Sequence, residues 1–268
     1  MRPARALAAT LALAIAAPAA GQETKLTPLS YDWTVDGIVT GAAAATVIGL
    51  QLSKNQLGPL ECKWCTPGSI DGDVARSVAW SNPKTANTLS DVMQFALPIG
   101  AIGYGVLQGY LLNDPSAGWS SALLITQATS IALLANVLVK YAVGRARPYV
   151  WMGQPGLYGD PHDENLSFFS GHTTLAFAVA VSAGTLFLMQ GMPGAGWVLG
   201  GGLALAAFTG YLRMGAEQHY LTDVLAGAAV GSLVGWAVPF LFHRPRQAGA
   251  APQPGALLPA PGGIAIAW

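Results

Sequence analysis

The stretch RMGAEQHYLTD, residues 213–223, places His219 four residues before Asp223. On one helix face this spacing lets the carboxylate accept the N–H of the imidazole. Such a bond would fix the tautomer and leave the other ring nitrogen as a nucleophile or base. For the pair taken alone, the alternative is a hydrogen bond with only a structural role.

A second group, SFFSGHTTLAF at residues 167–177, brings Ser170, Gly171 and His172 to the start of an apolar run. Serine or glycine before such a run indicates a helix start, where the first N–H groups lack internal partners. These amides and the helix dipole favour an anion, and Gly171 has no side chain to block its approach. The alternative for His172 is a packed or interfacial ring.

A third group, KYAVGRARP at residues 140–148, carries basic residues. Seven residues make nearly two helical turns, so we expect Lys140 and Arg147 on one face with Gly144 between them. Pro148 predicts that the helix stops near Arg147, and Arg145 should point elsewhere. The alternative is a basic helix end that snorkels to the membrane surface.

Together these groups supply what phosphoryl transfer needs without a metal. Lys140, Arg147 and Arg213 with the amides would neutralise the phosphate oxygens, one imidazole would attack, and the other would protonate the leaving oxygen. The sequence has no P-loop motif, no nucleophile-elbow serine and no carboxylate cluster suited to Mg²⁺. We therefore expect neither a metal nor a cofactor.

The composition indicates the frame that positions these groups. The chain of 268 residues is 52% hydrophobic and 10% charged with zero net charge, which favours a membrane protein and gives no reason to expect nucleic acid binding. Apolar stretches long enough to span a bilayer lie at 88–112, 118–139, 172–190, 195–212 and 221–242, with a shorter one at 37–52. We predict an all-α, antiparallel bundle of about six mostly transmembrane helices. A soluble, exported helical protein is the alternative.

The chain divides into three parts by composition. Residues 1–21 have the layout of a secretory signal peptide, or of an N-terminal anchor. Residues 22–246 should form the helical domain, and 247–268 a tail rich in Pro, Gly and Ala. Cys62 and Cys65 lack further ligands for zinc, so a local disulfide in an oxidising compartment is favoured over a redox dithiol.

The three groups resemble the motifs of the type 2 phosphatidic acid phosphatase (PAP2) superfamily, K-x6-R-P, P-S-G-H and S-R-x5-H-x3-D. Order and internal spacing match over a motif-bearing core of about 118–242. Phe169 replaces the proline of the second motif, and Leu212 replaces the serine of the third. The resemblance is to the bacterial membrane-associated lipid phosphatase branch, whose core is similar to that of the haloperoxidases.

The resemblance implies a role for each matching residue. His219 would be the nucleophile that forms a phosphohistidine, Asp223 would orient it, and His172 would be the general acid. The phosphate would be held by Lys140, Arg147, Ser170, Gly171 and Arg213. The implied activity is release of phosphate from a lipid phosphate or lipid diphosphate. The alternatives are an exported acid phosphatase, a vanadate-dependent haloperoxidase and a non-catalytic protein that binds lipid headgroups.

The loop 149–169 contains five aromatic residues of the types that settle at headgroup level: Tyr149, Trp151, Tyr158, Phe168 and Phe169. Arg244 and Arg246 favour a cytoplasmic end after the last helix, which would place the site on the periplasmic face of the inner membrane. If residues 1–21 export the N-terminus and 37–52 spans the membrane, the number of helices would place the site on the cytoplasmic side instead. We therefore expect 37–52 not to span fully. The sequence leaves the lipid substrate and the oligomeric state open.

Overall fold

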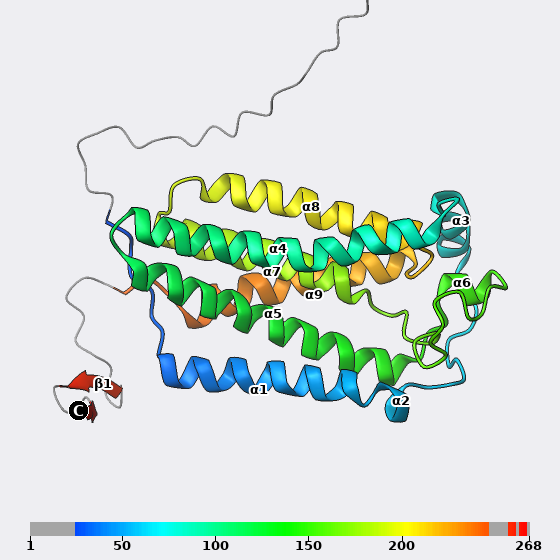
Figure 1. Cartoon of the computed structure of the whole chain (residues 1–268), viewed down its shortest axis with the longest axis horizontal. Helices are drawn as coiled ribbons and strands as arrows, with labels where there is room; N and C mark the ends of the chain where they lie inside the picture. The colour runs from blue at the N-terminus through cyan, green and yellow to red at the C-terminus, as the bar shows by residue number, and fades with distance from the viewer. Residues whose placement is uncertain (1–24, 247–256, 261–262, 267–268) are drawn as a thin grey trace, which may run out of the picture.

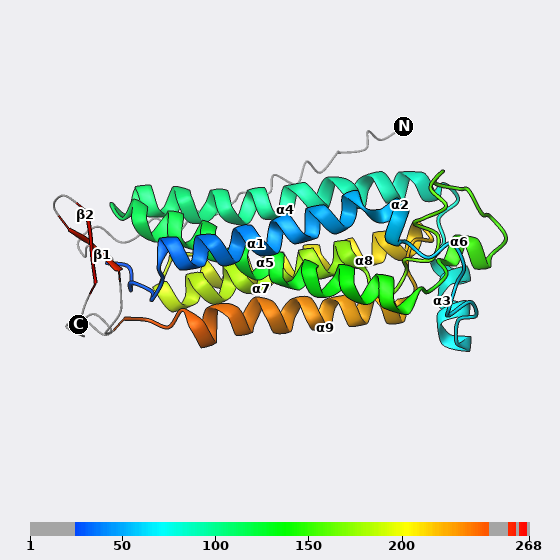
Figure 2. The same ribbon diagram turned by 90° about the horizontal axis from the view of Figure 1, so that it is seen from below.

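The structure, a computed structural model, describes residues 25–246, 257–260 and 263–266. Its main body is an antiparallel bundle (Figures 1 and 2) of six long helices: α1 (Trp33–Leu52), α4 (Pro83–Leu111), α5 (Pro115–Val143), α7 (Gly171–Gln190), α8 (Ala195–Gly215) and α9 (Leu221–Ala237), the last continued by the π-helical η1 (Val238–Phe242). All six are long and apolar enough to cross a bilayer. The chain is therefore an all-α membrane protein, as the apolar stretches predicted.

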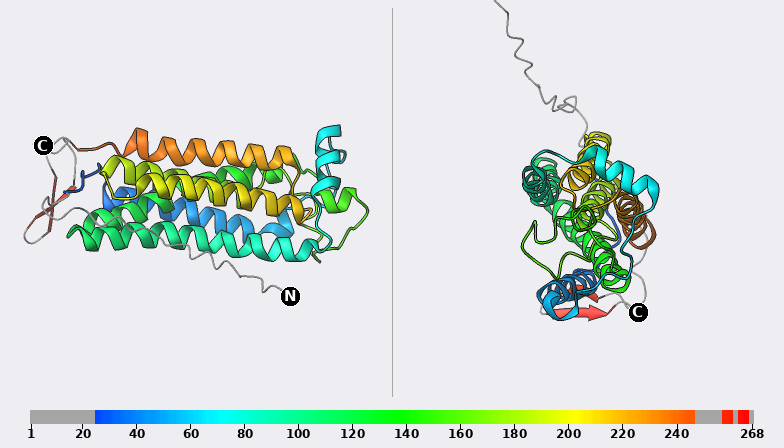
Figure 3. Two further views of the ribbon diagram at one scale, coloured as in Figure 1. Left: turned by 90° about the horizontal axis from the view of Figure 1, so that it is seen from above. Right: turned by 90° about the vertical axis from the view of Figure 1, so that its right-hand side faces the viewer.

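Three short helices gather at one end of the bundle, which we call the site end: α2 (Lys54–Leu57), α3 (Ser69–Val78) and α6 (Pro148–Trp151). Figure 3 looks onto this end in its right-hand view. Near the C-terminus, β1 (Leu257–Ala260) and β2 (Gly263–Ile266) pair antiparallel, with Leu257 opposite Ile266. The predicted segments 1–21 and 247–268 lie largely outside the described residues, so their assignments stay predictions.

Helix boundaries follow local chemistry. Asp32, Asn82 and Asp114 each cap a helix by accepting backbone N–H groups of its first turn, and proline follows the last two at the first helical position. Gly191 ends α7 in the left-handed conformation. The connections 112–114 and 191–194 are correspondingly short, so the helices that they join are antiparallel neighbours, as predicted.

The first helix is longer than the stretch 37–52 suggested. Capping by Asp32 starts α1 at Trp33, and its 20 residues span about 30 Å at a rise of ~1.5 Å per residue. The helix is therefore long enough to span the bilayer fully, which the stretch 37–52 did not indicate. Residues 25–32 and 243–246 lie together at the end opposite the site (Figure 1), where Ser30 N donates to Arg244 O at 2.9 Å.

The helix before Pro148 is shorter than predicted. It ends at Val143, because Gly144 adopts a left-handed conformation with φ +58° and turns the chain. Ala146 N then donates to Trp64 O, so the chain after Gly144 lies in extended pairing with the 62–65 loop. Lys140 and Arg147 thus do not share a helical face, and the loop path brings Arg147 back toward Lys140.

The centre of the bundle is α7, which packs on α4, α5, α8 and α9. Its closest neighbour is α9, whose Gly227, Gly231 and Gly235 face it at four-residue intervals. A Cβ added at Gly231 would lie 2.4 Å from the Thr174 carbonyl oxygen. Small residues at this spacing let two membrane helices approach closely, and this contact sets the first turn of α9 against the first turn of α7.

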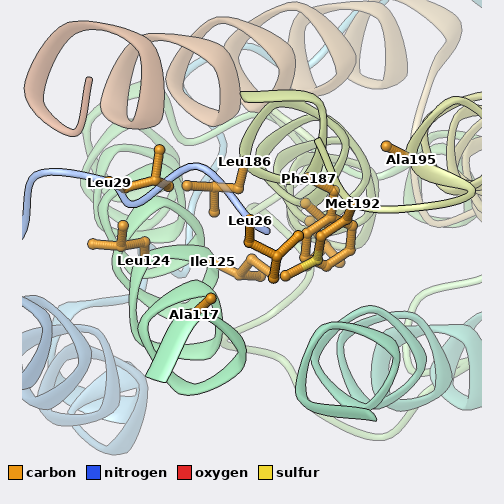
Figure 4. Close-up of a cluster of buried hydrophobic side chains, with 11 residues drawn as sticks. Leu26, Leu29, Ala117, Leu124, Ile125, Leu186, Phe187, Met192 and Ala195 are labelled. Atoms are coloured by element: carbon orange, nitrogen blue, oxygen red, sulfur yellow. The ribbon is translucent and has the colours of Figure 1, made fainter. Parts of the chain in front are cut away.

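The largest buried apolar cluster fills the end opposite the site (Figure 4), and its members include Leu26, Leu29, Leu124, Ile125, Leu186 and Phe187. Leu26 and Leu29 belong to the segment before α1, so this segment packs into the bundle at that end. The site end has the opposite character, since buried polar and charged residues concentrate there.

Candidate active site

The polar groups predicted from sequence lie around one cavity of about 350 Å³ at the site end. Its polar lining includes Lys140, Arg147, Gly171, His172, Arg213 and His219. These residues come from the last turns of α5 and α8, the first turn of α7 and two loops. Three motifs that are far apart in sequence therefore build one cationic chamber with two imidazoles.

Ser170 has a different position from the one expected. Its side chain is buried and caps α7, with the Thr173 hydroxyl donating to its Oγ at 2.8 Å. Gly171 does line the cavity. Its missing Cβ would sit 3.0 Å from Asn136 Oδ1, while Asn136 donates to Phe169 O at 2.7 Å. The first turn of α7 thus presents the Gly171 backbone to the cavity, whereas Ser170 stabilises the helix start.

His219 is almost fully buried, and its tautomer follows from its partners. Nδ1 lies 2.7 Å from the carbonyl oxygen of Ser167, which can only accept, so Nδ1 carries the proton. Nε2 therefore has the lone pair, 3.3 Å from Arg147 Nη1. Burial, with the charges of Arg147, Lys140 and Arg213, lowers the pKa of His219 well below its ordinary value. The ring is neutral with Nε2 in the cavity, as a nucleophile requires.

Asp223 orients His219 less directly than predicted. Its Oδ2 is 3.7 Å from His219 Nδ1, beyond hydrogen-bond range. It instead accepts from Ser167 Oγ at 2.6 Å and from Tyr220 N at 2.9 Å. The four-residue rule fails because His219 precedes α9, which begins at Leu221. Asp223 thus fixes Ser167, and the Ser167 carbonyl fixes the imidazole.

Arg145, which we expected to point away from the site, is the cation that pairs with Asp223. Its guanidinium is buried and bonds Asp223 Oδ1 at 2.5 Å and Asp71 Oδ2 of α3 at 2.6 Å. The rings of Trp64 and Tyr220 lie 3.8 and 4.2 Å from it. A local signal existed, since Arg145 is a third basic residue in its motif, but its partners are more than 70 residues away.

Trp64 belongs to the loop closed by the Cys62–Cys65 disulfide, whose Cα atoms are 5.3 Å apart. Lys63 N and Trp64 N both approach the Gly144 carbonyl oxygen, at 2.9 and 3.3 Å. The disulfide loop is therefore packed on the backbone of the first motif, on the side away from the cavity.

An acidic residue outside the motifs, Asp163, also lines the cavity. Its Oδ2 pairs with Arg147 Nη2 at 2.7 Å, and its carbonyl oxygen accepts from Arg147 Nε at 2.8 Å. Burial alone would raise the pKa of this carboxyl, but Arg147, Lys140 and Lys54 outweigh that effect and lower it to about 2. The lining of the cavity thus includes one negative charge beside its cations.

His172 lies in the first turn of α7 with its side chain 19% exposed. Its Nε2 is 2.9 Å from Asp91 Oδ1 on α4. The third cation, Arg213, bonds two other α4 residues, Asn87 at 2.7 Å and Ser90 at 3.1 Å. These α4 residues lie outside the three motifs, and their attachment to the site has no local signal in the sequence.

The loop 149–169 carries the five aromatic residues expected at headgroup level. Tyr149 and Phe169 are buried, and the other three are only partly exposed. They pack on the protein, as where Tyr149 meets the ring of Tyr158 or Phe168 meets that of Trp64. These rings thus contribute to packing within the site end, and their place at headgroup level stays a prediction.

The fold and site define a membrane protein with three cations and two imidazoles around one cavity, and comparisons with known proteins show what this chain resembles. The model of the PAP2 superfamily matches residues 120–247, a little under half of the chain. The chain is similar to the lipid A 1-phosphatase of Porphyromonas gingivalis, 34% identical over 145 residues, which are 52% of this chain and 29% of the relative. The chain thus matches less than a third of that relative's length.

A second relative is the undecaprenyl-diphosphatase BcrC of Bacillus subtilis, 28% identical over 159 residues, or 59% of this chain and 75% of the relative. Among solved structures, a transmembrane PAP2-type phosphatidylglycerolphosphate phosphatase from Bacillus subtilis superposes with a TM-score of 0.51 at 17% identity. The superposition covers 73% of this chain and 94% of that one. At this identity the likeness concerns the fold.

Proposed function

We propose that the protein is a lipid phosphate phosphatase, which removes phosphate from a lipid phosphate or lipid diphosphate through a phosphohistidine on His219. The observation that carries the proposal is the unprotonated Nε2 of His219, a residue that lines a cavity with three cations. The two relatives support it, since both are by name phosphatases of lipid-linked groups. The six apolar helices favour this function over that of a soluble acid phosphatase.

In the proposed reaction, Lys140, Arg147 and Arg213 with the Gly171 N–H hold the phosphate oxygens. His219 Nε2 attacks phosphorus, and the bond from phosphorus to the leaving oxygen breaks. His172 donates its proton to that oxygen, which leaves as the lipid alcohol, or as a lipid monophosphate when the substrate is a diphosphate. Water then attacks phosphorus while His172 takes a proton from it, the bond from phosphorus to His219 Nε2 breaks, and inorganic phosphate leaves the neutral imidazole.

The walls of the cavity support a lipid substrate. Val47 and Gln51 of α1, Gln94 of α4, Leu133 of α5 and Leu175 of α7 line the part of the cavity within the bundle. Apolar residues on membrane-spanning helices suit the chain-bearing side of a lipid, while the cations hold its phosphate. We propose that the headgroup enters this cavity with its acyl or prenyl part toward the bilayer.

The decisive experiment measures phosphate release by the purified protein in detergent. The panel contains phosphatidate, phosphatidylglycerol phosphate, a polyprenyl diphosphate and lipid A, each with and without EDTA or vanadate. We expect release that resists EDTA, is inhibited by vanadate, is lost in His219→Ala and falls to a residual rate in His172→Ala. His162→Ala is the matched control, because the His162 ring lies outside the cavity and its Nδ1 has no partner among the described residues.

The same preparation separates the alternatives. Bromide oxidation that requires added vanadate would favour a haloperoxidase. Binding of these lipids by the intact protein without release of phosphate from any of them would favour a headgroup-binding protein. Full activity in His219→Ala would end the phosphohistidine proposal.

We further propose that the protein lies in the inner membrane with the site end facing the periplasm. The disulfide at the site end supports an oxidising side, and Arg244 and Arg246 at the other end fit the cytoplasm. Single cysteines at Pro155 on the site end and Ser116 on the other end test this with a membrane-impermeant maleimide on spheroplasts. We expect Pro155→Cys to react in intact spheroplasts and Ser116→Cys only after permeabilisation. The reverse pattern would favour export of the N-terminus by residues 1–21.

A further inference from the structure

One helix outside the three motifs, α4, contacts both the general acid and the cradle. Asp91 Oδ1 lies 2.9 Å from His172 Nε2, and Asp91 Oδ2 accepts from Asn87 Nδ2 at 2.8 Å. Asn87 Oδ1 in turn accepts from Arg213 Nη1 at 2.7 Å. An unbroken chain of hydrogen bonds therefore runs from a phosphate-binding cation through α4 to the histidine.

The donors and acceptors in this chain are fixed by chemistry. Arginine only donates and a carboxylate only accepts, so the amide of Asn87 has one orientation, with oxygen toward Arg213 and nitrogen toward Asp91. By the same reasoning, the proton of His172 Nε2 faces Asp91. Within the described residues Nδ1 of His172 has no hydrogen-bond partner, and the ring lines the cavity. Nδ1 is thus the nitrogen left for a substrate.

A protonated His172 needs an anionic neighbour at this place. Lys140, Arg147 and Arg213 line the same cavity and repel an imidazolium. Among the described residues, Asp91 is the carboxylate in contact with its ring. Asp163, the acidic residue that lines the cavity, pairs with Arg147 instead.

We propose that Asp91 is a positioning residue that acts through His172: it holds the ring by Nε2 and stabilises the imidazolium whose Nδ1 proton goes to the leaving oxygen. The inference rests on the proposed function and extends it to a residue of α4. In the first step the Nδ1 proton passes to the leaving oxygen while the Nε2 proton stays on the Asp91 side. In the second step Nδ1 recovers a proton from the attacking water.

The test compares two substrates in detergent, a lipid phosphate with a poor alkoxide leaving group and p-nitrophenyl phosphate, whose leaving group departs without a proton. Asp91→Asn keeps the shape and removes the charge. We expect kcat for the lipid phosphate to fall about 10- to 100-fold with KM nearly unchanged, since general acids contribute roughly 10²–10⁴. For p-nitrophenyl phosphate the change should stay within about threefold, and Asp91→Glu should restore part of the lipid activity.

A double variant asks whether Asp91 acts through the histidine. In a His172→Ala background, Asp91→Asn should cost less than about twofold, because groups that act as a unit are not additive. Asp73→Asn, an exposed acid on α3 with a side chain 73% exposed, is the matched control.

The outcomes separate the two proposals. Equal losses for both substrates, no loss for either, or a full further loss in the His172→Ala background would overturn the role of Asp91 while leaving the phosphatase intact. A wild-type protein that releases phosphate from neither substrate would instead overturn the proposed function, and the role of Asp91 with it.

Discussion

The two halves of the site are held in opposite ways. His219 is 1% exposed and is fixed by a backbone carbonyl, behind which lie the buried carboxylate of Asp223 and the buried guanidinium of Arg145. His172 is 19% exposed and is held by Asp91, whose own side chain is 48% exposed. We call the buried group around His219 the rigid half, because hydrogen bonds and ion pairs hold it on all sides. We call His172 and Asp91 the open half, because both side chains are partly exposed.

This difference matches the chemistry proposed for each ring. A nucleophile must keep one nitrogen aligned with phosphorus, and misplacement by about 1 Å can cost on the order of 10²-fold in rate. A general acid must reach leaving groups that differ between substrates, and it must recover its proton from water. A buried network suits the nucleophile, and the partly exposed pair of His172 and Asp91 suits the general acid.

The largest effect should come from the rigid half. His219→Ala removes the only atom proposed to bond phosphorus, so phosphate release should fall by roughly 10⁴-fold or more. The variant should also take up no ³²P from labelled substrate in a single turnover. His172→Ala should differ in kind, because it should still be labelled by p-nitrophenyl phosphate. Equal labelling of wild type and His219→Ala would place the nucleophile elsewhere.

Removal of the guanidinium behind the nucleophile should affect both stability and rate. Arg145→Met leaves Asp71 and Asp223 buried without their shared cation, which should lower the free energy of unfolding by about 3–5 kcal/mol. Labelling of His219 should slow on the order of 10²-fold in the folded fraction. Thermal unfolding in detergent and single-turnover labelling measure the two effects.

Arg76→Met is the matched control for this change, since Arg76 pairs with Asp73 on the surface, with side chains 56% and 73% exposed. Its effect should stay within about 0.5 kcal/mol. If the two arginine variants unfold alike, the buried network does not support the rigid half.

The two halves also differ in how far sequence could predict them. Apolar runs predicted the six helices, and motif spacing predicted the residues that meet in the cavity, because both signals are local. The partners that hold those residues are not local: Asp91 is 81 residues from His172 and Arg145 is 78 from Asp223. No spacing rule reaches across such separations.

Local rules also failed where a helix ended earlier or began later than assumed. Gly144 stops α5 before Arg147, and α9 starts after His219. The helical spacings K-x6-R and H-x3-D therefore each cross a helix boundary. Lys140 and Arg147 still line one cavity, but through a turn of the backbone, whereas Asp223 and His219 lie 3.7 Å apart and do not form the predicted hydrogen bond.

A smaller effect should come from the cradle between the two halves. Asp163→Asn removes the negative charge that pairs with Arg147 at 2.7 Å. A freed guanidinium should bind anions more tightly, so the inhibition constants for vanadate and inorganic phosphate should fall about three- to tenfold, as expected for ~1 kcal/mol. Asp160→Asn, which affects the Lys54 pair in the same loop, is the control. Weaker inhibition in Asp163→Asn would mean that Asp163 orders the cradle instead of competing with the anion.

The smallest effect should be that of acid on the rigid half. Burial and the neighbouring cations lower the pKa of His219, so its ring loses its proton at a lower pH than the ~6.5 of a free imidazole. The nucleophile is then already neutral at the pH where a free imidazole would gain its proton, and acid in that range should not switch it off. Single-turnover labelling with p-nitrophenyl phosphate isolates this step, because that leaving group bypasses His172. If labelling is lost near the pKa of the phosphate group of p-nitrophenyl phosphate, the pH of that loss should shift when a lipid phosphate is the substrate instead. A loss centred near 6.5 for both substrates would show that His219 titrates as an ordinary exposed histidine, and the contrast between a rigid and an open half would fail.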